Sequence, residues 1–221
     1  MRLPDFSKSR LSLARPINSY SKVRVAYGGM IRNARWQLRA ERVRTLRYLN
    51  VGCGPKLNDR FIGLDWEWVP GLDLCWDATK GLPFTDGSQA GIFSEHMLEH
   101  LPFKEGLGVI REMRRVLVPD GGRARIVVPD LELYVDLYIR ARTEDVVFPY
   151  TGNVRSPAWH LNWPFYEHGH RFLYDADLLC NCLLQAGFSK AERVAFGTGT
   201  PELLIDSPER AVESLYVEAV A

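Results

Sequence analysis

The sequence lacks the features of several protein classes. No apolar run approaches the roughly 20 residues that a membrane-spanning helix needs, which excludes an integral membrane protein of that kind. Charged residues make up 25% and aromatic residues 11% of the 221 residues, and such ordinary globular values exclude wholesale disorder. Cysteine is scarce and no hydrophobic signal segment precedes it, so we expect reduced thiols and a cytoplasmic protein. The cysteines are Cys53, Cys75, Cys180 and Cys182.

The net charge of +1 conceals two oppositely charged parts. Residues 1–47 carry twelve Lys and Arg side chains against two acids, whereas the rest of the chain carries 16 basic and 25 acidic side chains. The basic segment is open to three interpretations: a contact with a protein partner or second copy, a surface for anionic lipid or nucleic acid, or a solvated face with a lid over a cofactor. We expect a peripheral membrane or protein contact through residues 1–47. Nucleic acid is disfavoured, because the sequence contains no recognised reading module.

Alternating strands and helices predict one α/β domain with a mainly parallel sheet over residues 46–221, preceded by a basic arm and an amphipathic helix over residues 1–45. The two last strands lie close together in the chain, which favours an antiparallel finish. Residues 149–170 are rich in Pro, Gly, Asn, Trp and His and are expected to form a long surface loop. The expected strands are residues 46–51, 61–64, 90–93, 125–128, 192–196 and 215–220, and the expected helices are residues 30–44, 106–117, 131–142 and 175–186, after an extended arm over residues 1–28.

One constellation carries the chemistry. A strand ends in Gly52-Cys53-Gly54, and the next strand ends in Asp65. Glycines allow a tight turn and a close approach of a ligand to the backbone. A carboxylate at the end of the following strand is placed to bind the hydroxyls of a ribose. The pattern therefore predicts a nucleoside site at the carboxyl edge of the sheet.

The spacing of this constellation argues against a dinucleotide. Leu57 stands where a third glycine would let a helix pack closely, and only residues 52–60 separate the two strands. Such a short crossover leaves no room for the long helix whose N-terminus receives a pyrophosphate. A nicotinamide oxidoreductase is therefore disfavoured, and a nucleoside without phosphates is favoured.

At these residues the sequence resembles the class I S-adenosylmethionine-dependent methyltransferases, over residues 46 to 130 or thereabouts. The resemblance implies an α/β, doubly wound, Rossmann-like fold with a mainly parallel seven-stranded sheet and an antiparallel last strand, and S-adenosyl-L-methionine as the cofactor. The truncated first helix and residues 125–132 look most like a subgroup met in bacterial surface-polysaccharide gene sets. The motifs that carry the resemblance are residues 49–54, residues 62–65, Asp77-Ala78 before Leu82-Pro83-Phe84, residues 93–101 and residues 115–122.

The resemblance implies a role for each matching position. Gly52 and Gly54 would face the methionine part of the cofactor. Asp65 would bind the ribose hydroxyls. Asp77 would accept a hydrogen bond from the adenine amino group, with Ala78 beside it.

The end of the strand at residues 90–93 would complete the cofactor site. Ser94 and Glu95 would flank the methionine and the transferred methyl group. Asn50 stands where the family usually has an acid, which leaves the contact to the methionine ammonium group open. The residues expected to bind the cofactor are Asn50, Gly52, Cys53, Gly54, Asp65, Trp66, Asp77, Ala78, Ser94 and Glu95.

Three histidines are candidates for catalysis, because an oxygen or nitrogen nucleophile can need a base and histidine suits that role near neutral pH. His96 comes directly after the fourth-strand motif, and His168 and His170 lie in the loop expected to overhang the pocket. Arg171 and Tyr174 would help them to bind a polar or anionic acceptor. No metal site is expected, because this His-x-His pair has no identifiable carboxylate partner.

These features predict an enzyme: a methyltransferase that acts on an oxygen, or less readily a nitrogen, of a small molecule or glycan. His100, which follows Glu99, is expected to pack in a helix or to make a hydrogen bond rather than to act in catalysis. The alternative is a non-catalytic protein of the same fold that docks through its basic arm, and Asn50 keeps that alternative open.

Overall fold

The computed structural model describes residues 22–34, 40–149 and 156–221. The predicted extended arm over residues 1–28 therefore lies mostly outside the described residues. Its last part, from residue 22, is helical instead of extended.

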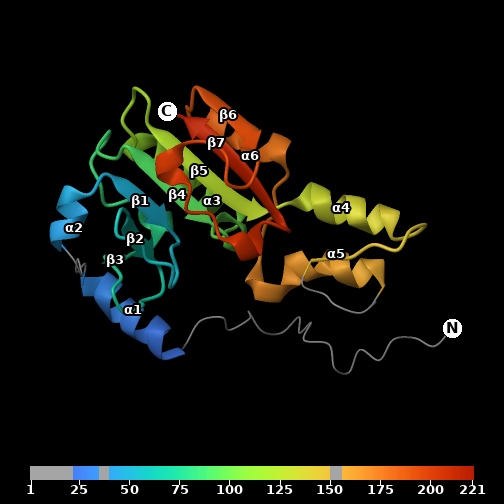
Figure 1. Ribbon diagram of the computed structural model, residues 1–221. Helices are drawn as coiled ribbons and strands as arrows, with labels where there is room; N and C mark the ends of the chain where they lie inside the picture. The colour runs from blue at the N-terminus through green and yellow to red at the C-terminus, as the bar shows by residue number, and fades with distance from the viewer. Residues whose placement is uncertain (1–21, 35–39, 150–155) are drawn as a thin grey trace.

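The fold is a seven-stranded mixed sheet with helices packed against it (Figure 1). The strand order is β3-β2-β1-β4-β5-β7-β6; β7 pairs antiparallel with β5 and β6, and the other neighbours are parallel. The predicted α/β fold with its antiparallel finish is confirmed. The strands are β1 (Tyr48–Val51), β2 (Ile62–Asp65), β3 (Leu74–Cys75), β4 (Gly91–Glu95), β5 (Arg123–Pro129), β6 (Lys190–Val194) and β7 (Ser214–Val220). The helices are α1 (Lys22–Ala34), α2 (Ala40–Thr45), α3 (Phe103–Val116), α4 (Leu131–Arg140), α5 (Pro157–Tyr166) and α6 (Ala176–Gln185).

The central strands are buried on both faces, as parallel strands are when both sides of the sheet are covered. Neighbouring residues of a strand point to opposite faces. In β4, Ile92 joins the main core formed with α3 and α6, whereas Phe93 joins a second core with Phe61 and Leu203 on the other face. The carboxyl ends of β1, β2 and β4 meet at one edge because these strands are parallel.

Helix α1 packs against this sheet beside its edge strand β3. Ile31 is buried in a small cluster with Cys53, Leu72 and Cys75. A Cβ atom at Gly28 would come within 3.3 Å of the Cys75 sulfur, so glycine permits this close packing. The helix begins earlier than the predicted residue 30, and residues 35–39, inside the predicted helix, lie outside the described residues.

Residues 157–166 form helix α5, so the prediction of a long loop over residues 149–170 is wrong for this part. Pro164 lies inside this helix, and a proline in the sequence argues against a helix. Because Pro164 is near the end of α5, it removes only one backbone hydrogen bond. Aromatic contacts stabilise the helix. Trp159 and Trp163, one turn apart, have ring centroids at 5.0 Å, and His160 stacks on Phe148 at 4.2 Å.

No helix in the described ranges is long and apolar enough to cross a membrane.

Candidate cofactor and acceptor site

Two cavities open where the parallel strands end. The first, of about 440 Å³, is the glycine-loop cavity, and the second, of about 600 Å³, is the histidine cavity. They share Gly52, Asp65 and His96, so the two spaces adjoin at the carboxyl ends of β1, β2 and β4. Predicted cofactor residues that line the glycine-loop cavity are Asn50, Gly52, Cys53, Gly54, Asp65 and Glu95, and those that line the histidine cavity are Gly52, Asp65, Trp66, Asp77 and Ala78.

The glycine loop after β1 needs its two glycines. Gly52 has a φ of 76° and Gly54 a φ of 50°. Residues other than glycine rarely adopt such positive φ angles. A Cβ atom at Gly52 would also collide with the side chain of Met97. At Gly54 a Cβ atom would meet no atom within 4 Å, because this residue faces the cavity. The loop therefore presents bare backbone to a ligand.

Asp65 ends β2 and lines both cavities. Its Oδ2 accepts the backbone N–H of Gly54 and its Oδ1 accepts that of Glu67, both at 2.7 Å. The side chain is 8% exposed, and burial raises the pKa of the carboxyl group against the lowering effect of these two bonds. Because each carboxylate oxygen has two lone pairs, both oxygens can still accept a hydrogen bond from a ribose hydroxyl group.

Asn50 lies in β1 and also lines the glycine-loop cavity. It is 4% exposed, and its Oδ1 has no hydrogen-bond partner among the described residues. Leaving a buried acceptor unsatisfied costs about 1–3 kcal/mol. A donor such as an ammonium group would satisfy Oδ1, so Asn50 can still contribute an acceptor where the family usually has an acid.

The histidine cavity has a polar and an aromatic wall. Asp77 caps the short turn Ala78–Lys80: its Oδ1 accepts the Thr79 backbone N–H at 3.0 Å and the Thr79 hydroxyl at 2.6 Å. Trp66 is partly exposed, and the guanidinium carbon of Arg32 lies 4.2 Å from its ring centroid. Val25 lines the same cavity, so helix α1 contributes to its wall.

Ser94 and Glu95, the last two residues of β4, are predicted to flank the methionine, but only Glu95 lines a cavity. Glu95 lines the glycine-loop cavity, with Lys56 at 3.7 Å, and accepts the backbone N–H of Ser207 at 2.9 Å and the Ser207 hydroxyl. Ser94 is buried and lines neither cavity. Strand alternation explains this difference, because Ser94 points to the opposite face from Phe93 and Glu95.

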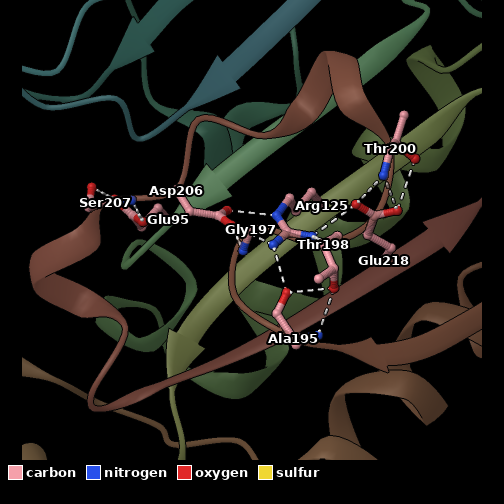
Figure 2. A network of polar contacts seen from close by, with 9 residues as sticks. All are labelled: Glu95, Arg125, Ala195, Gly197, Thr198, Thr200, Asp206, Ser207 and Glu218. Atoms are coloured by element: carbon pink, nitrogen blue, oxygen red, sulfur yellow. Dashed lines mark hydrogen bonds and ion pairs between the residues drawn. The ribbon is translucent and has the colours of Figure 1, made fainter.

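A buried ionic network holds Ser207 in place (Figure 2). Asp206, which precedes Ser207, accepts hydrogen bonds from Nε and Nη2 of Arg125 at 2.6 and 2.5 Å. Arg125 is completely buried, and its Nη1 also donates to Glu218 at 2.9 Å. The network ties the segment over Glu95 to strands β5 and β7.

The three predicted catalytic histidines occupy different positions. His96, at a φ of 50°, lines both cavities; burial is the main cause that lowers its pKa, to about 2. His168 lines the histidine cavity together with Arg171. His170 lies next to His100 and His168, with ring centroids at 4.9 and 5.9 Å, and lines neither cavity; burial lowers its pKa to about 3. Tyr174 is fully buried in the main core, contrary to its predicted contact with the acceptor.

Sequence reasoning missed two residues of this region. His100 lines the histidine cavity and is hydrogen-bonded to the backbone of Gly169, and Glu99 is a fully buried acid next to it. The sequence contains a signal for this cluster: Glu99 is an acid next to a histidine, and both stand between the apolar residues Leu98 and Leu101.

Comparisons with a family model and with solved structures find matches. Residues 53–123 match the family described as "Methyltransferase domain". The fold is similar to a SAM-dependent methyltransferase from Archaeoglobus fulgidus (TM-score 0.51, 15% identity, 90% of this chain and 94% of that chain covered). It is also similar to an S-adenosylmethionine-dependent methyltransferase from Mesorhizobium loti (TM-score 0.50, 16% identity, 80% and 91% covered). A comparison with curated proteins gives no match.

The matched segment contains Gly54, Asp65, Asp77 and Glu95, and the fold around it is that of the class I methyltransferases. The matched segment and the fold are therefore similar to those of the S-adenosyl-L-methionine-dependent methyltransferases. This is a class of enzymes, with S-adenosyl-L-methionine as its cofactor.

Proposed function

We propose that the protein transfers the methyl group of S-adenosyl-L-methionine to an oxygen nucleophile of a small molecule or glycan. The observation that carries the proposal is the buried, unsatisfied Oδ1 of Asn50, which lines a cavity together with Gly52, Gly54 and Asp65. A glycine loop, a buried acceptor and a strand-end carboxylate are complementary to the amino acid and ribose parts of this cofactor.

The proposed binding mode assigns one part of the cofactor to each group of residues. Asn50 accepts from the ammonium group, and the backbone of residues 52–54 faces the methionine. Asp65 accepts from the ribose hydroxyls, because it is the acid that both cavities share. Asp77 and Ala78 hold the adenine beside Trp66.

The transferred methyl group is proposed to lie near His96, where the two cavities adjoin. When bound, the cofactor supplies an electrophilic methyl group, so the contribution of the chain is to hold the acceptor in line with it. The His96 side chain is only 9% exposed; its Nε2 lies 2.8 Å from the Ser214 hydroxyl and its Nδ1 lies 3.4 Å from the buried Glu99. We therefore assign proton acceptance to His168 and anchoring of a polar acceptor to Arg171.

A sugar hydroxyl suits the surroundings of His168. The ring of Trp163 lies 6.2 Å from the His168 ring in an edge-on arrangement, and Phe165 and Tyr166 are exposed on the same helix. Aromatic faces stack on the apolar faces of sugar rings. This supports a glycan or glycan precursor as acceptor and agrees with the resemblance to enzymes of bacterial surface-polysaccharide gene sets.

The basic N-terminal segment is proposed to bind peripherally to the surface of an anionic membrane. Val23 and Met30 of α1 are 77% and 70% exposed, on a helix that also carries Arg24. Exposed apolar residues among basic ones are typical of helices that lie on membrane surfaces. Sedimentation with anionic vesicles tests this assignment, and equal sedimentation with neutral vesicles would contradict it.

A labelled-methyl assay tests the proposed reaction. The protein is incubated with S-adenosyl-L-methionine labelled at the methyl group and with separate pools of oligosaccharides, small hydroxylated metabolites and small amines. We expect label in a hydroxyl-bearing pool, and His168→Asn should lower kcat while the affinity for S-adenosylhomocysteine stays unchanged. Binding of S-adenosylhomocysteine without label in any pool would favour the non-catalytic alternative.

A further inference from the structure

Three histidines surround the carboxylate of Glu99 at the border of the histidine cavity. Nδ1 of His96 lies 3.4 Å from Glu99 Oε1, Nε2 of His170 at 3.8 Å and Nε2 of His100 at 3.9 Å. The potential ligand atoms of Glu99, His100 and His170 all lie within 4.8 Å of one another. We propose that Glu99, His100 and His170, with His96 as a fourth ligand, bind a divalent transition-metal ion.

The first support is the state of Glu99. Its side chain is 0% exposed, and neither carboxylate oxygen has a hydrogen-bond partner among the described residues. A buried carboxylate without a donor is costly, and buried charges in proteins are paired or coordinate metals. The three imidazole nitrogens are too far from Oε1 for hydrogen bonds. A cation among these four side chains would satisfy them at once.

The second support is that the other ring nitrogen of His170 and of His96 has a partner of its own. Nδ1 of His170 donates to the carbonyl oxygen of Pro164, which leaves Nε2 with its lone pair toward Glu99. His96 uses Nε2 for the Ser214 hydroxyl. His100 is hydrogen-bonded to the backbone of Gly169. Histidines that bind metals are typically oriented in this way, by a hydrogen bond from the second ring nitrogen.

Local backbone structure brings the cluster together. Glu99 and His100 lie in the short 3₁₀ turn Leu98–His100, directly after β4. The carbonyl oxygen of Glu99 accepts the backbone N–H groups of Arg171 at 2.7 Å and Phe172 at 3.2 Å. These two bonds fix His170 against the turn. The arrangement is therefore set by the backbone as well as by side-chain packing.

The donor set selects the kind of ion. Imidazole nitrogen with one carboxylate oxygen suits Zn²⁺, Fe²⁺, Co²⁺ or Mn²⁺, whereas Ca²⁺ and Mg²⁺ prefer oxygen ligands. Zinc binds nitrogen and oxygen at about 2.0–2.2 Å, which places tetrahedral ligand atoms roughly 3.4 Å apart. The ligand atoms of Glu99, His100 and His170, now within 4.8 Å of one another, would therefore approach by roughly 1.4 Å at most. Such a movement is within reach of rotations about the side-chain bonds of Glu99 and the histidines.

The surrounding charges are compatible with a cation. The positive charge of Arg210 acts on Glu99 and on the histidines, but its Nη1 is paired with the carboxylate of Glu213 at 2.9 Å. Glu95 and Glu213 add negative charge near Glu99. The acids therefore offset the guanidinium.

The position of the cluster suggests its use. His96 and His100 line the histidine cavity, whereas His170 does not, so an ion would have an accessible side toward the proposed acceptor. An ion there would orient an oxygen of the acceptor as a Lewis acid. This use rests on the proposed function, whereas the metal site itself does not.

Titration with Co²⁺ tests the site, because its visible absorption reports the ligands directly. The full-length protein is treated with a chelator, dialysed and titrated with Co²⁺ in the absence of cofactor, with bound metal counted by elemental analysis. We expect one Co²⁺ per chain with visible d–d bands, and competition by Zn²⁺. Glu99→Gln and His170→Asn should each weaken Co²⁺ binding by at least about 10-fold.

The matched control is Glu105→Gln, which makes the same chemical change in an exposed acid of α3 that lines the same cavity but lies outside the cluster. It should leave Co²⁺ affinity unchanged. Circular dichroism confirms that each variant is folded, and His100→Asn replaces any variant that is not. No Co²⁺ bands in the wild type, or equal affinity in Glu99→Gln and Glu105→Gln, would overturn the proposal. Co²⁺ binding without S-adenosylhomocysteine binding would instead leave the metal site standing and contradict the proposed function.

Discussion

The carboxylate of Asp65, at the end of β2, accepts the backbone N–H of Gly54 at 2.7 Å. The acid expected to bind a ribose therefore also fixes the glycine loop that is expected to face the methionine. The two halves of the proposed cofactor site are coupled through this one bond, and a change in either residue should affect both.

The glycine loop should not tolerate a side chain at its first position. Gly52→Ala introduces a Cβ atom that collides with Met97 and a residue that is strained at a φ of 76°. We expect a loss of stability of about 1–3 kcal/mol together with weaker binding of S-adenosylhomocysteine. Urea unfolding and calorimetry measure the two effects.

The control for this change is Gly108→Ala in helix α3. A Cβ atom there meets nothing within 4 Å, and alanine is favoured over glycine in a helix by up to about 1 kcal/mol. The control should therefore be neutral or stabilising. Equal effects of the two substitutions would contradict the description of the glycine loop.

Arg125 should be essential for stability. Arg125→Met removes the partner of two largely buried carboxylates, Asp206 and Glu218, and breaking such a pair costs about 3–5 kcal/mol. Arg140→Met is the control, because the half-exposed Arg140 pairs with the exposed acids Asp136 and Glu144, and exposed pairs contribute little to stability. Chemical denaturation of both variants measures the difference, and similar losses would show that the network is not structurally dominant.

The thiol of Cys53 should be unreactive. Burial, aided by the negative charges of Asp65 and Asp73, raises its pKa well above the usual value. Alkylation at pH 8 should therefore label the partly exposed Cys180 before Cys53. Cys53 lines the glycine-loop cavity, so S-adenosylhomocysteine should slow its labelling further. Mass spectrometry identifies the labelled peptides, and labelling of Cys53 that the ligand does not affect would place the cofactor elsewhere.

Acid should weaken the contact between α3 and the segment before β4. Hydrogen bonds from Arg115 are the main cause that lowers the pKa of Glu112, whose Oε2 also accepts the Leu82 N–H at 2.8 Å. A carboxyl with a lowered folded pKa stabilises the fold above its unfolded pKa, here 4.5, and this stability is lost as the pH falls through the lower folded value. Glu112→Gln should flatten the acid limb of a stability–pH curve. A parallel downward shift at all pH values would contradict this assignment.

The sequence predicted those parts of the site that depend on local pattern. The turn at Gly52 and Gly54 and the acid at the end of β2 were both expected, because strand ends and glycines leave a signature within a few residues. The orientation of Ser94 away from the cavities and the burial of Tyr174 depend on packing between elements, which the linear pattern does not contain.

The cluster around Glu99 shows why the rest was missed. His170 reaches Glu99 only because two backbone N–H groups, of Arg171 and Phe172, bond to the Glu99 carbonyl oxygen. His170 is far from Glu99 and His100 in the chain, so no spacing rule for metal ligands links it to them. The expectation of no metal site rested on the lack of a carboxylate near His170, and the structure places one at 3.8 Å.

Calorimetric titration with S-adenosylhomocysteine tests the central claim most directly. Hydrogen bonds to charged groups contribute about 1.5–3 kcal/mol, so Asp65→Ala should bind at least about 10-fold more weakly than the wild type, which should bind one equivalent. Asp120→Ala, in an exposed turn, should bind as the wild type does. No binding to the wild type, or equal binding to Asp65→Ala, would contradict the proposed cofactor site.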